Sequence, residues 1–192
     1  YFGVTPDQAR ECKQAYYAAI SFVDAQIGRV LDTLDRLKLW DRTVVVFWSD
    51  HGFHLGEHDL WGKTTNYELD TRVPLIVAGP SVTAKGGRAN GLVELIDLYP
   101  TLIESCGLPA MAGLEGRSLG PQLRNAAAPG KRLAISQHPH PYYGKATHMG
   151  YAVRSATHRY VEWRERPSGA VAARELYDHA VDPAETRNRV DD

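Results

Sequence analysis

The chain has 192 residues, which is enough for one domain with a real core and a small appended unit. Hydrophobic residues make up 43% and charged residues 23%, and the net charge of -1 gives no electrostatic reason to expect a nucleic-acid or anionic-membrane partner. No window approaches the roughly 18 uninterrupted apolar residues of a membrane-spanning helix, so no membrane span is expected.

The chain does not begin with Met, and its first residues, YFGVTP, lack the charged and apolar regions of a signal peptide. We therefore expect a fragment or a processed chain, whose N-terminus does not reveal the compartment. Cys12 and Cys106 are too few for a disulfide framework and too far apart in the sequence for a metal knuckle. Two buried thiols are expected.

A long helix is predicted near the start of the chain. Thr5 can cap this helix, Pro6 suits the first helical position, and Gln8 completes a capping box. Apolar residues then recur at spacings of three and four up to about Lys38, and they are Tyr16, Ile20, Val23, Ile27, Val30, Leu31 and Leu34. The pattern predicts an amphipathic helix that covers a sheet.

Two buried strands are predicted next. Residues 43–48, TVVVFW, show no polar alternation, so both faces of this strand should be covered, as in a parallel α/β sheet. Residues 73–78, VPLIVA, give a second strand that ends at Gly79 and Pro80. The loop at residues 51–66 is longer than most connections in compact domains and is predicted to be functional.

The second half of the chain has a different pattern of apolar and polar residues. Asp97 is predicted to cap a helix over residues 98–106, and residues 109–131, rich in Gly, Pro and Ala, are interpreted as a connector. Short, partly alternating segments predict a small antiparallel sheet, and they lie at residues 132–136, 150–154, 159–163 and 175–178. The predicted organisation is an α/β part over residues 1–108, the connector over 109–131, and a C-terminal α+β subdomain over 132–192.

Candidate chemistry is concentrated where the first strand ends. Asp50 and His51 directly follow that strand, and ligands in open α/β sheets bind outside the carboxyl ends of the strands. Two residues do not complete a metal site, because calcium takes six to eight ligands and magnesium takes six. No second acidic cluster at a strand end is apparent, so other ligands must come from elsewhere. The plain alternative is an Asp that caps the loop and a His bonded to a backbone carbonyl.

Lys63 returns from the loop towards the same strand end. An ammonium group beside a strand-end metal could bind an oxyanion and stabilise charge that develops on a leaving oxygen. The alternative is a solvated surface lysine. The neighbours of Lys63 are Trp61, Gly62 and two threonines instead of a run of charges, and this favours the site.

Nearly the whole chain resembles the sulfatase family of the alkaline phosphatase superfamily, and it is most similar to the iduronate-2-sulfatase branch. The resemblance rests on YYAAISFVDAQIG at 16–28, SDHG at 49–52, LGEH at 55–58, the spacing of Trp61 and Lys63, and TRVPLI at 71–76. It continues in LIDLYPTL at 95–102, SQHP at 136–139, MGYAVR at 149–154 and ELYD at 175–178. The resemblance implies an α/β fold, with part of an alkaline-phosphatase-like parallel sheet covered by helices and a small C-terminal antiparallel sheet.

The resemblance also implies roles for residues of the central loop. Asp50 and His51 would ligate a divalent cation, calcium in this family. Lys63 would contact the sulfate and stabilise or protonate the leaving-group oxygen, and Phe53 would form a pocket wall near the sugar. The family's nucleophile is a formylglycine made from Cys or Ser in a C/S-x-P-x-R motif, and neither cysteine of this chain lies in such a motif. The chain alone should therefore be inactive, with the missing N-terminal part of the same protein as its partner.

The C-terminal subdomain of this branch lends a basic group to the uronate carboxylate of the substrate. His140 or Lys145 is a candidate for that role, with plain surface exposure as the alternative. Tyr142 and Tyr143 could stack on a sugar or pack at a sheet edge. The loop histidines His54 and His58 are expected to pack within the loop or to support other groups.

A sulfuric ester hydrolase acting on a sulfated carbohydrate in the intact protein is the function that the resemblance implies. Its family places it in a periplasmic, secreted or lysosomal location. Two alternatives stay open. One is a phosphatase or phosphonate monoester hydrolase of the same superfamily, and the other is a non-catalytic module that binds sulfated glycans through Lys63 and the C-terminal basic groups.

Overall fold

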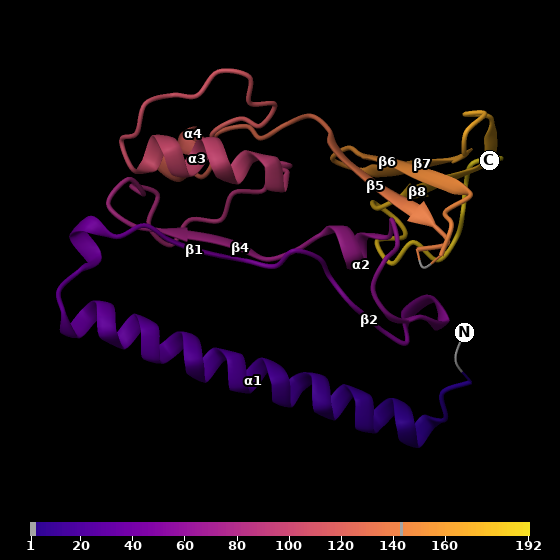
Figure 1. The fold of residues 1–192 in the computed structure, drawn as a ribbon, viewed down its shortest axis with the longest axis horizontal. Coiled ribbons are helices and arrows are strands. Elements are labelled where there is room, and N and C mark those ends of the chain that lie inside the picture. Colours follow the sequence, from indigo (N-terminus) through magenta and orange to yellow (C-terminus); the bar gives the residue numbers. More distant parts are fainter. Residues whose placement is uncertain (1–2, 143) are drawn as a thin grey trace.

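A computed structural model describes residues 3–142 and 144–192 of the chain. The helix α1 (Pro6–Arg36) runs along one side of the molecule, and the paired strands β1 (Val45–Trp48) and β4 (Leu75–Ala78) lie in its middle (Figure 1). The helices α3 (Leu98–Ser105) and α4 (Gly120–Arg124) lie beyond that pair, and a four-stranded sheet forms one end. Among the described residues, no helix combines the length and apolar composition that crossing a bilayer requires.

The helix α1 confirms the prediction from the capping residues. The Thr5 hydroxyl accepts a hydrogen bond from the Gln8 amide (3.3 Å), and the Gln8 side chain accepts one from the Thr5 amide (2.9 Å). These two bonds satisfy amides that a helix start otherwise leaves unpaired. No residue of α1 is buried, so the apolar stripe that was expected to cover a sheet lies largely uncovered in this chain.

The strands β1 and β4 form the central pair, and they run antiparallel with Val45 opposite Ala78 and Trp48 opposite Leu75. The expectation of parallel strands is therefore wrong for this pair. The Gly52 amide, just beyond β1, donates to the Asp70 carbonyl, just before β4 (2.9 Å), so β4 begins where β1 ends and runs back beside it. A parallel pair would need a crossover that returns the chain to the start of β1.

The faces of these two strands are not fully covered. Trp48 of β1 is 48% exposed and Ile76 of β4 is 60% exposed, so the prediction that both faces of the strand are buried is also wrong for this chain. An apolar run without alternation indicates a strand suited to burial on both sides. It does not specify which elements provide the cover.

The long loop after β1 is folded into short elements. A two-residue pairing joins His54 to Gly62 and Leu55 to Trp61, and a 3₁₀ turn lies between these strands. The elements, in order, are β2 (His54–Leu55), a 3₁₀ turn (Glu57–Asp59), β3 (Trp61–Gly62) and α2 (Glu68–Thr71). The loop predicted to be functional is thus an ordered hairpin followed by one helical turn.

The predicted helix over residues 98–106 is present as α3, preceded by a 3₁₀ turn at Leu95–Asp97. Asp97 occupies the N-cap position, but its side chain does not cap α3. Instead its buried carboxylate accepts hydrogen bonds from the amides of Glu94 (2.9 Å) and Arg117 (2.8 Å). This carboxylate therefore ties the segment predicted as a connector, which contains α4, to the start of α3.

Both cysteines are exposed, so the expectation of buried thiols is wrong. Cys12 lies on α1, none of whose residues is buried, and Cys106 is the C-cap of α3. Free cysteine is among the residue types most often buried. At these two positions no other element of the described chain covers the thiol.

The C-terminal antiparallel sheet is confirmed. Its strands pair in sequence order and are β5 (Ala134–His140), β6 (His148–Arg154), β7 (His158–Glu165) and β8 (Val171–Asp178). A tight turn joins β6 to β7, with the Ser155 amide donating to the His158 carbonyl (2.8 Å). Buried apolar residues of this sheet form most of the described core, and they are Met149, Ala152, Val161 and Tyr177.

Candidate active site

Asp50, His51 and Lys63 come together at the end of β1. The Lys63 Nζ lies 2.6 Å from the His51 Nε2, and the same imidazole nitrogen lies 3.5 Å from the Asp50 Oδ2. Asp50 and Lys63 are exposed, and His51 is half-buried. Asp50, His51 and Lys63, which the sequence predicts to meet at the end of this strand, therefore do so.

The protonation of His51 follows from its second ring nitrogen. The His51 Nδ1 lies 2.8 Å from the Gly52 carbonyl oxygen, which can only accept a hydrogen bond. The hydrogen therefore sits on Nδ1, and the Nε2 lone pair points to the space shared with Asp50 and Lys63. This is the form of histidine that can ligate a metal through Nε2.

Gly52 is required by close packing beneath the site. A Cβ atom at residue 52 would lie 1.7 Å from the Leu69 carbonyl oxygen, so no other residue fits without moving the backbone. The Gly52 amide donates to the Asp70 carbonyl at the same place. The backbone that carries His51 is thus held against α2.

The hairpin β2–β3 returns Lys63 to β1 through residues with left-handed backbone. Gly56 (φ 111°) and Gly62 (φ 120°) adopt conformations that favour glycine, and Thr64 has φ 84°. The lysine lies between Gly62 and Thr64. Its position therefore depends on what fixes the backbone on either side.

His54 and His58 pack within this loop, as expected from the sequence. His54 is fully buried, with its Nδ1 at 3.3 Å from the Glu57 carbonyl and its Nε2 at 3.3 Å from the Thr65 hydroxyl. The ring of His58 stacks on Tyr67, with centroids 4.0 Å apart. Neither imidazole is bonded to the group formed by Asp50, His51 and Lys63 in the described part of the chain.

Asp70 is the buried acid of the loop, and the sequence analysis missed it. Its Oδ2 accepts hydrogen bonds from the amide and the hydroxyl of Thr65, both at 2.7 Å, and its Oδ1 lies 3.5 Å from the His54 Nε2. Burial alone would raise the pKa of Asp70, but the hydrogen bonds from His54 and Thr65 outweigh it and lower that pKa. In the sequence Asp70 reads as an ordinary polar residue of a short helix.

Phe53 lies beside the site on the side of α1. Its ring is 38% exposed and packs against Tyr16, with centroids 5.3 Å apart. The ring that is predicted to form a pocket wall therefore packs against α1.

His140 and Lys145 lie at the end of β5 and in the following loop, and both are exposed. The His140 ring packs edge-on against Trp163 at 5.9 Å. Among the described interactions, none joins either residue to Asp50, His51 or Lys63. Tyr142 stacks on His138 at 5.5 Å, and Tyr143 lies outside the described residues.

The C-terminal sheet contacts the loop that carries Lys63. A Cβ atom at Gly150 of β6 would lie 2.4 Å from the Asn66 side-chain nitrogen, so the glycine makes room for a residue three positions after Lys63. Gly150 pairs with His138 on β5, the strand that ends at His140. The two basic candidates are thus carried by a sheet that abuts the site loop.

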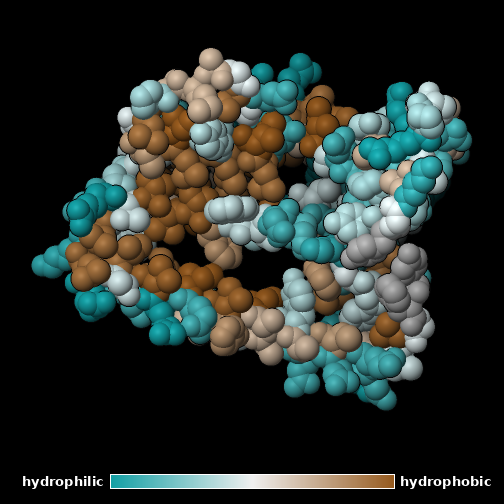
Figure 2. Space-filling view, in the orientation of Figure 1, coloured by the Kyte–Doolittle hydropathy of each residue, from teal (hydrophilic) through white to brown (hydrophobic). Residues whose placement is uncertain are grey.

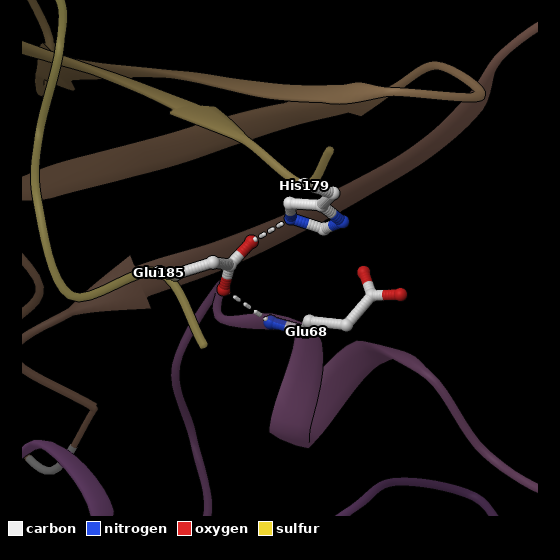
Figure 3. Close-up of side chains that lie close together, drawn as sticks. All are labelled: Glu68, His179 and Glu185. Carbon is white, nitrogen blue, oxygen red and sulfur yellow. Dashed lines mark hydrogen bonds and ion pairs between the residues drawn. The ribbon is translucent and has the colours of Figure 1, made fainter. Parts of the chain in front are cut away.

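A second cluster joins α2 to the end of the chain (Figure 3). The ligand atoms of Glu68, His179 and Glu185 lie within 4.8 Å of one another, and the His179 Nε2 is 2.7 Å from the Glu185 Oε1. Arg159 donates to both carboxylates, and Arg154 donates to Glu68 (3.1 Å). The two guanidinium groups already balance the acids, so this cluster is a buried charge network and a poor cation site.

Two family models match the chain. A family model described as Sulfatase matches residues 1–108. A model described as N-sulphoglucosamine sulphohydrolase, C-terminal, matches residues 56–192. Together they extend over the whole chain, including the Asp50–Lys63 loop and the C-terminal sheet.

Curated relatives are similar over most of the chain. A sulfatase of Formosa agariphila is 38% identical over 175 residues, 91% of this chain and 32% of that protein. The iduronate 2-sulfatase of Mus musculus is 30% identical and covers 100% of this chain and 46% of that protein. Arylsulfatase K of Homo sapiens is 30% identical over 190 residues, which cover 96% of this chain and 34% of that protein. The chain spans between about a third and a half of the length of these relatives.

Solved structures share the fold. A 2-O GAG sulfatase has a TM-score of 0.84 at 27% identity, covering 98% of this chain and 40% of that chain. A protein in complex with its substrate D-glucosamine-2-N,6-O-disulfate has a TM-score of 0.80 at 28% identity, covering 90% and 35%. A phosphonate monoester hydrolase from Silicibacter pomeroyi has a TM-score of 0.74 at 29% identity, covering 88% and 35%.

Proposed function

Because this chain belongs to the sulfatase family, we propose that in the full-length protein it forms one wall of a site that hydrolyses a sulfate ester of a sugar. The observation that carries the proposal is the meeting of Lys63 Nζ, His51 Nε2 and Asp50 Oδ2 beyond the end of β1. An ammonium group, an imidazole and a carboxylate at one strand end suit an oxyanion substrate held beside a cation.

Asp50 and His51 fit as two ligands of a divalent cation, calcium by our proposal. Their ligand atoms are 3.5 Å apart, a separation that two donors of one cation with bonds of about 2.0–2.5 Å can have. The Gly52 carbonyl accepts from the His51 Nδ1, so the neutral ring would offer its Nε2 lone pair to the cation. A bound cation would offset the negative charge of the sulfate oxygens. Two donors are too few for calcium, so the proposal needs further ligands from the full-length protein.

Lys63 supplies the charge on the leaving-group side. We propose that its ammonium group contacts the sulfate and stabilises or protonates the leaving oxygen as the S–O bond breaks. Cys12 and Cys106 lie outside a C/S-x-P-x-R sequence, so the proposed formylglycine nucleophile belongs to another part of the full-length protein. The 192-residue chain by itself is then inactive.

The proposed substrate is a sulfated carbohydrate. Support comes from relatives that include an iduronate 2-sulfatase, a 2-O GAG sulfatase and a protein whose substrate is a disulfated glucosamine. Phe53 and Tyr16 offer an aromatic surface of the kind on which a sugar ring stacks. His140, at the end of β5, or Lys145, in the loop between β5 and β6, is proposed to bind a carboxylate of an iduronate-like sugar.

Phosphonate or phosphate ester hydrolysis is the second candidate. The observation in its favour is the similarity to a phosphonate monoester hydrolase, 29% identical with a TM-score of 0.74. The same three side chains would serve it, because phosphoryl and sulfuryl groups both present tetrahedrally arranged oxygens to a cation and an ammonium group. Only the preferred ester separates the two candidates. A non-catalytic glycan-binding module would bind sulfated sugars without turnover.

The test is an assay of the full-length protein against an aryl sulfate and an aryl phosphate, with and without a chelator. We expect preference for the sulfate, loss of activity on chelation, and recovery on addition of calcium. Replacement Lys63→Ala should lower kcat about 100-fold, because a donor at the developing charge is removed, with the fold intact by circular dichroism. Lys85→Ala, at an exposed lysine of another loop, is the matched control.

Three outcomes would contradict the proposal. Preference for the phosphate would support the second candidate, and binding of a sulfated sugar without turnover would support the glycan-binding module. Activity that is indifferent to the chelator would overturn the cation site at Asp50 and His51.

A further inference from the structure

Asp70 contacts both sides of the candidate site although it touches neither His51 nor Lys63. Its carboxylate accepts hydrogen bonds from the amide and the hydroxyl of Thr65, both at 2.7 Å. Its backbone carbonyl accepts a hydrogen bond from the Gly52 amide at 2.9 Å. Thr65 is two residues from Lys63, and Gly52 adjoins His51. One residue of α2 therefore holds the two backbone segments whose side chains meet.

His54 completes this group, which we name the Asp70 cluster: Asp70, Thr65 and His54. Both nitrogens of the buried His54 ring face acceptors, the Glu57 carbonyl on one side and the Thr65 hydroxyl and Asp70 carboxylate on the other. The doubly protonated imidazole can satisfy both sides at once, and its charge is then balanced by Asp70. The Thr65 hydroxyl donates a hydrogen bond to Asp70 and accepts one from the Tyr67 amide (3.1 Å).

The Lys63 backbone needs such support. Lys63 is exposed, has a long flexible side chain, and lies between Gly62 and Thr64, both with positive φ. The bonds from Thr65 to Asp70 are the nearest anchor on the C-terminal side of the lysine to a buried residue. Without these bonds, the distance between the Lys63 Nζ and the His51 Nε2 would change as the backbone of the loop moves.

We propose that the Asp70 cluster is a positioning group that sets the separation of the Lys63 ammonium from His51, and thereby the rate of the chemical step. This inference rests on the proposed function for its effect on catalysis. The effect on the loop itself does not depend on that function. Misplacement of a reacting group by about 1 Å can lower a rate on the order of 100-fold, so a group that never touches substrate can still control kcat.

The test replaces members of the cluster in the full-length protein. Asp70→Asn keeps the size of the side chain but loses its charge, and Thr65→Val loses the hydroxyl while retaining the backbone amide. We expect kcat on an aryl sulfate to fall about 10- to 100-fold in Asp70→Asn and less in Thr65→Val, with KM changed much less. Thr65→Ser keeps the hydroxyl and should restore most of the activity.

Asp97→Asn is the matched control. Asp97 is also a buried aspartate that accepts two backbone amides, from Glu94 and Arg117, and it pairs with a cation, Lys131 (2.7 Å). It lies at the start of α3, outside the site loop. Its replacement should lower the melting temperature as Asp70→Asn does while leaving kcat unchanged, because it removes the same kind of bonds elsewhere.

Hydrogen exchange separates this inference from the proposed function. In Asp70→Asn the Thr65 amide should lose protection while the Gly52 amide, which donates to a backbone carbonyl, keeps it. Equal kcat losses in Asp70→Asn and Asp97→Asn, or unchanged protection of residues 63–67, would overturn the positioning role. If the wild-type protein hydrolyses no sulfate ester, the proposed function fails, and exchange at Thr65 still decides whether Asp70 fixes the loop. If Asp70→Asn does not fold, Thr65→Val and Thr65→Ser provide the comparison.

Discussion

His54 and Asp70 form a buried acid–base pair whose charges depend on pH. Burial by itself would lower the pKa of His54, but the hydrogen bond and charge of Asp70 outweigh it, and the pKa lies above the ordinary 6.5. Burial would raise the pKa of Asp70, but the hydrogen bonds from His54 and Thr65 outweigh it and hold that pKa below the ordinary 3.8. The charged pair is therefore favoured in the folded protein relative to the unfolded chain.

Removal of the imidazole should reveal this linkage. The contribution of His54 is fully present below its unfolded pKa of 6.5 and is lost as pH rises through the higher folded value. The contribution of Asp70 to stability is present above its unfolded pKa of 3.8 and is lost as pH falls through its lower folded pKa. The loss of melting temperature in His54→Gln should therefore be largest between pH 3.8 and 6.5 and smaller in alkaline buffer. His158→Gln, at a 48% exposed histidine, is the control, and a pH-independent loss in His54→Gln would contradict the pairing.

The residues of the site differ in how far the sequence could indicate them. Asp50, His51 and Lys63 were predicted to meet because a polar pair follows an apolar strand and a lysine returns from a glycine-containing loop, and their meeting is confirmed. Their roles stay predictions. Asp70 could not be found in this way, because its bonds to Thr65 and Gly52 exist only once the loop has folded.

The helices and strands also differ in how far the sequence indicates them. The helix α1 and the four C-terminal strands follow from local signals, a capping box and short alternating segments, and are confirmed. The sequence predicts that β1 and β4 are strands of a parallel sheet, whereas these two strands pair with each other antiparallel. A strand's own residues report that it is buried, but the direction of its neighbour is set by the path of the chain between them.

Arg159 joins three elements that are remote in sequence. It lies on β7 with only 1% of its side chain exposed, and it donates to Glu68 of α2 and to Glu185 near the end of the chain. Burial would raise the pKa of Glu68, but the hydrogen bond from Arg154 and the charge of Arg159 lower it. Glu68 therefore depends on these guanidinium groups to remain ionised.

Replacement Arg159→Met should destabilise the protein by about 3–5 kcal/mol, because it removes a buried guanidinium partner from the buried Glu185 and the half-buried Glu68. Urea unfolding at neutral pH measures the change. Arg164→Ala breaks an ion pair with Glu162 on the same strand, but Arg164 is 45% exposed, and its loss should cost only about 0–1 kcal/mol. Equal losses in the two variants would show that the buried network contributes no more than a surface pair.

At the scale of the whole molecule, the chain exposes more surface than its mass requires. Its accessible surface is 13166 Å², whereas a folded monomer of 21.3 kDa has roughly 9,000 Å². Figure 2 shows apolar side chains gathered around an open gap between α1 and the elements that face it. Exposed apolar residues of α1, β1 and β4 include Ile20, Val23 and Val30 on α1, Phe47 and Trp48 on β1, and Ile76 on β4. An amphipathic stripe in a sequence predicts that a face will be covered, but not by what.

The isolated 192-residue chain should therefore bind a hydrophobic dye and self-associate as its concentration rises. Contiguous apolar patches of more than a few hundred Å² are rare on soluble monomers and promote association. The double replacement Val23→Lys and Val30→Lys places charges on the exposed α1 face with residues that favour helices, so dye fluorescence and association should both fall while helix content by circular dichroism is kept. A monomer without dye binding at all concentrations would contradict this prediction, because it would mean that α1 closes onto the β1–β4 pair in solution and buries the face that is open in Figure 2.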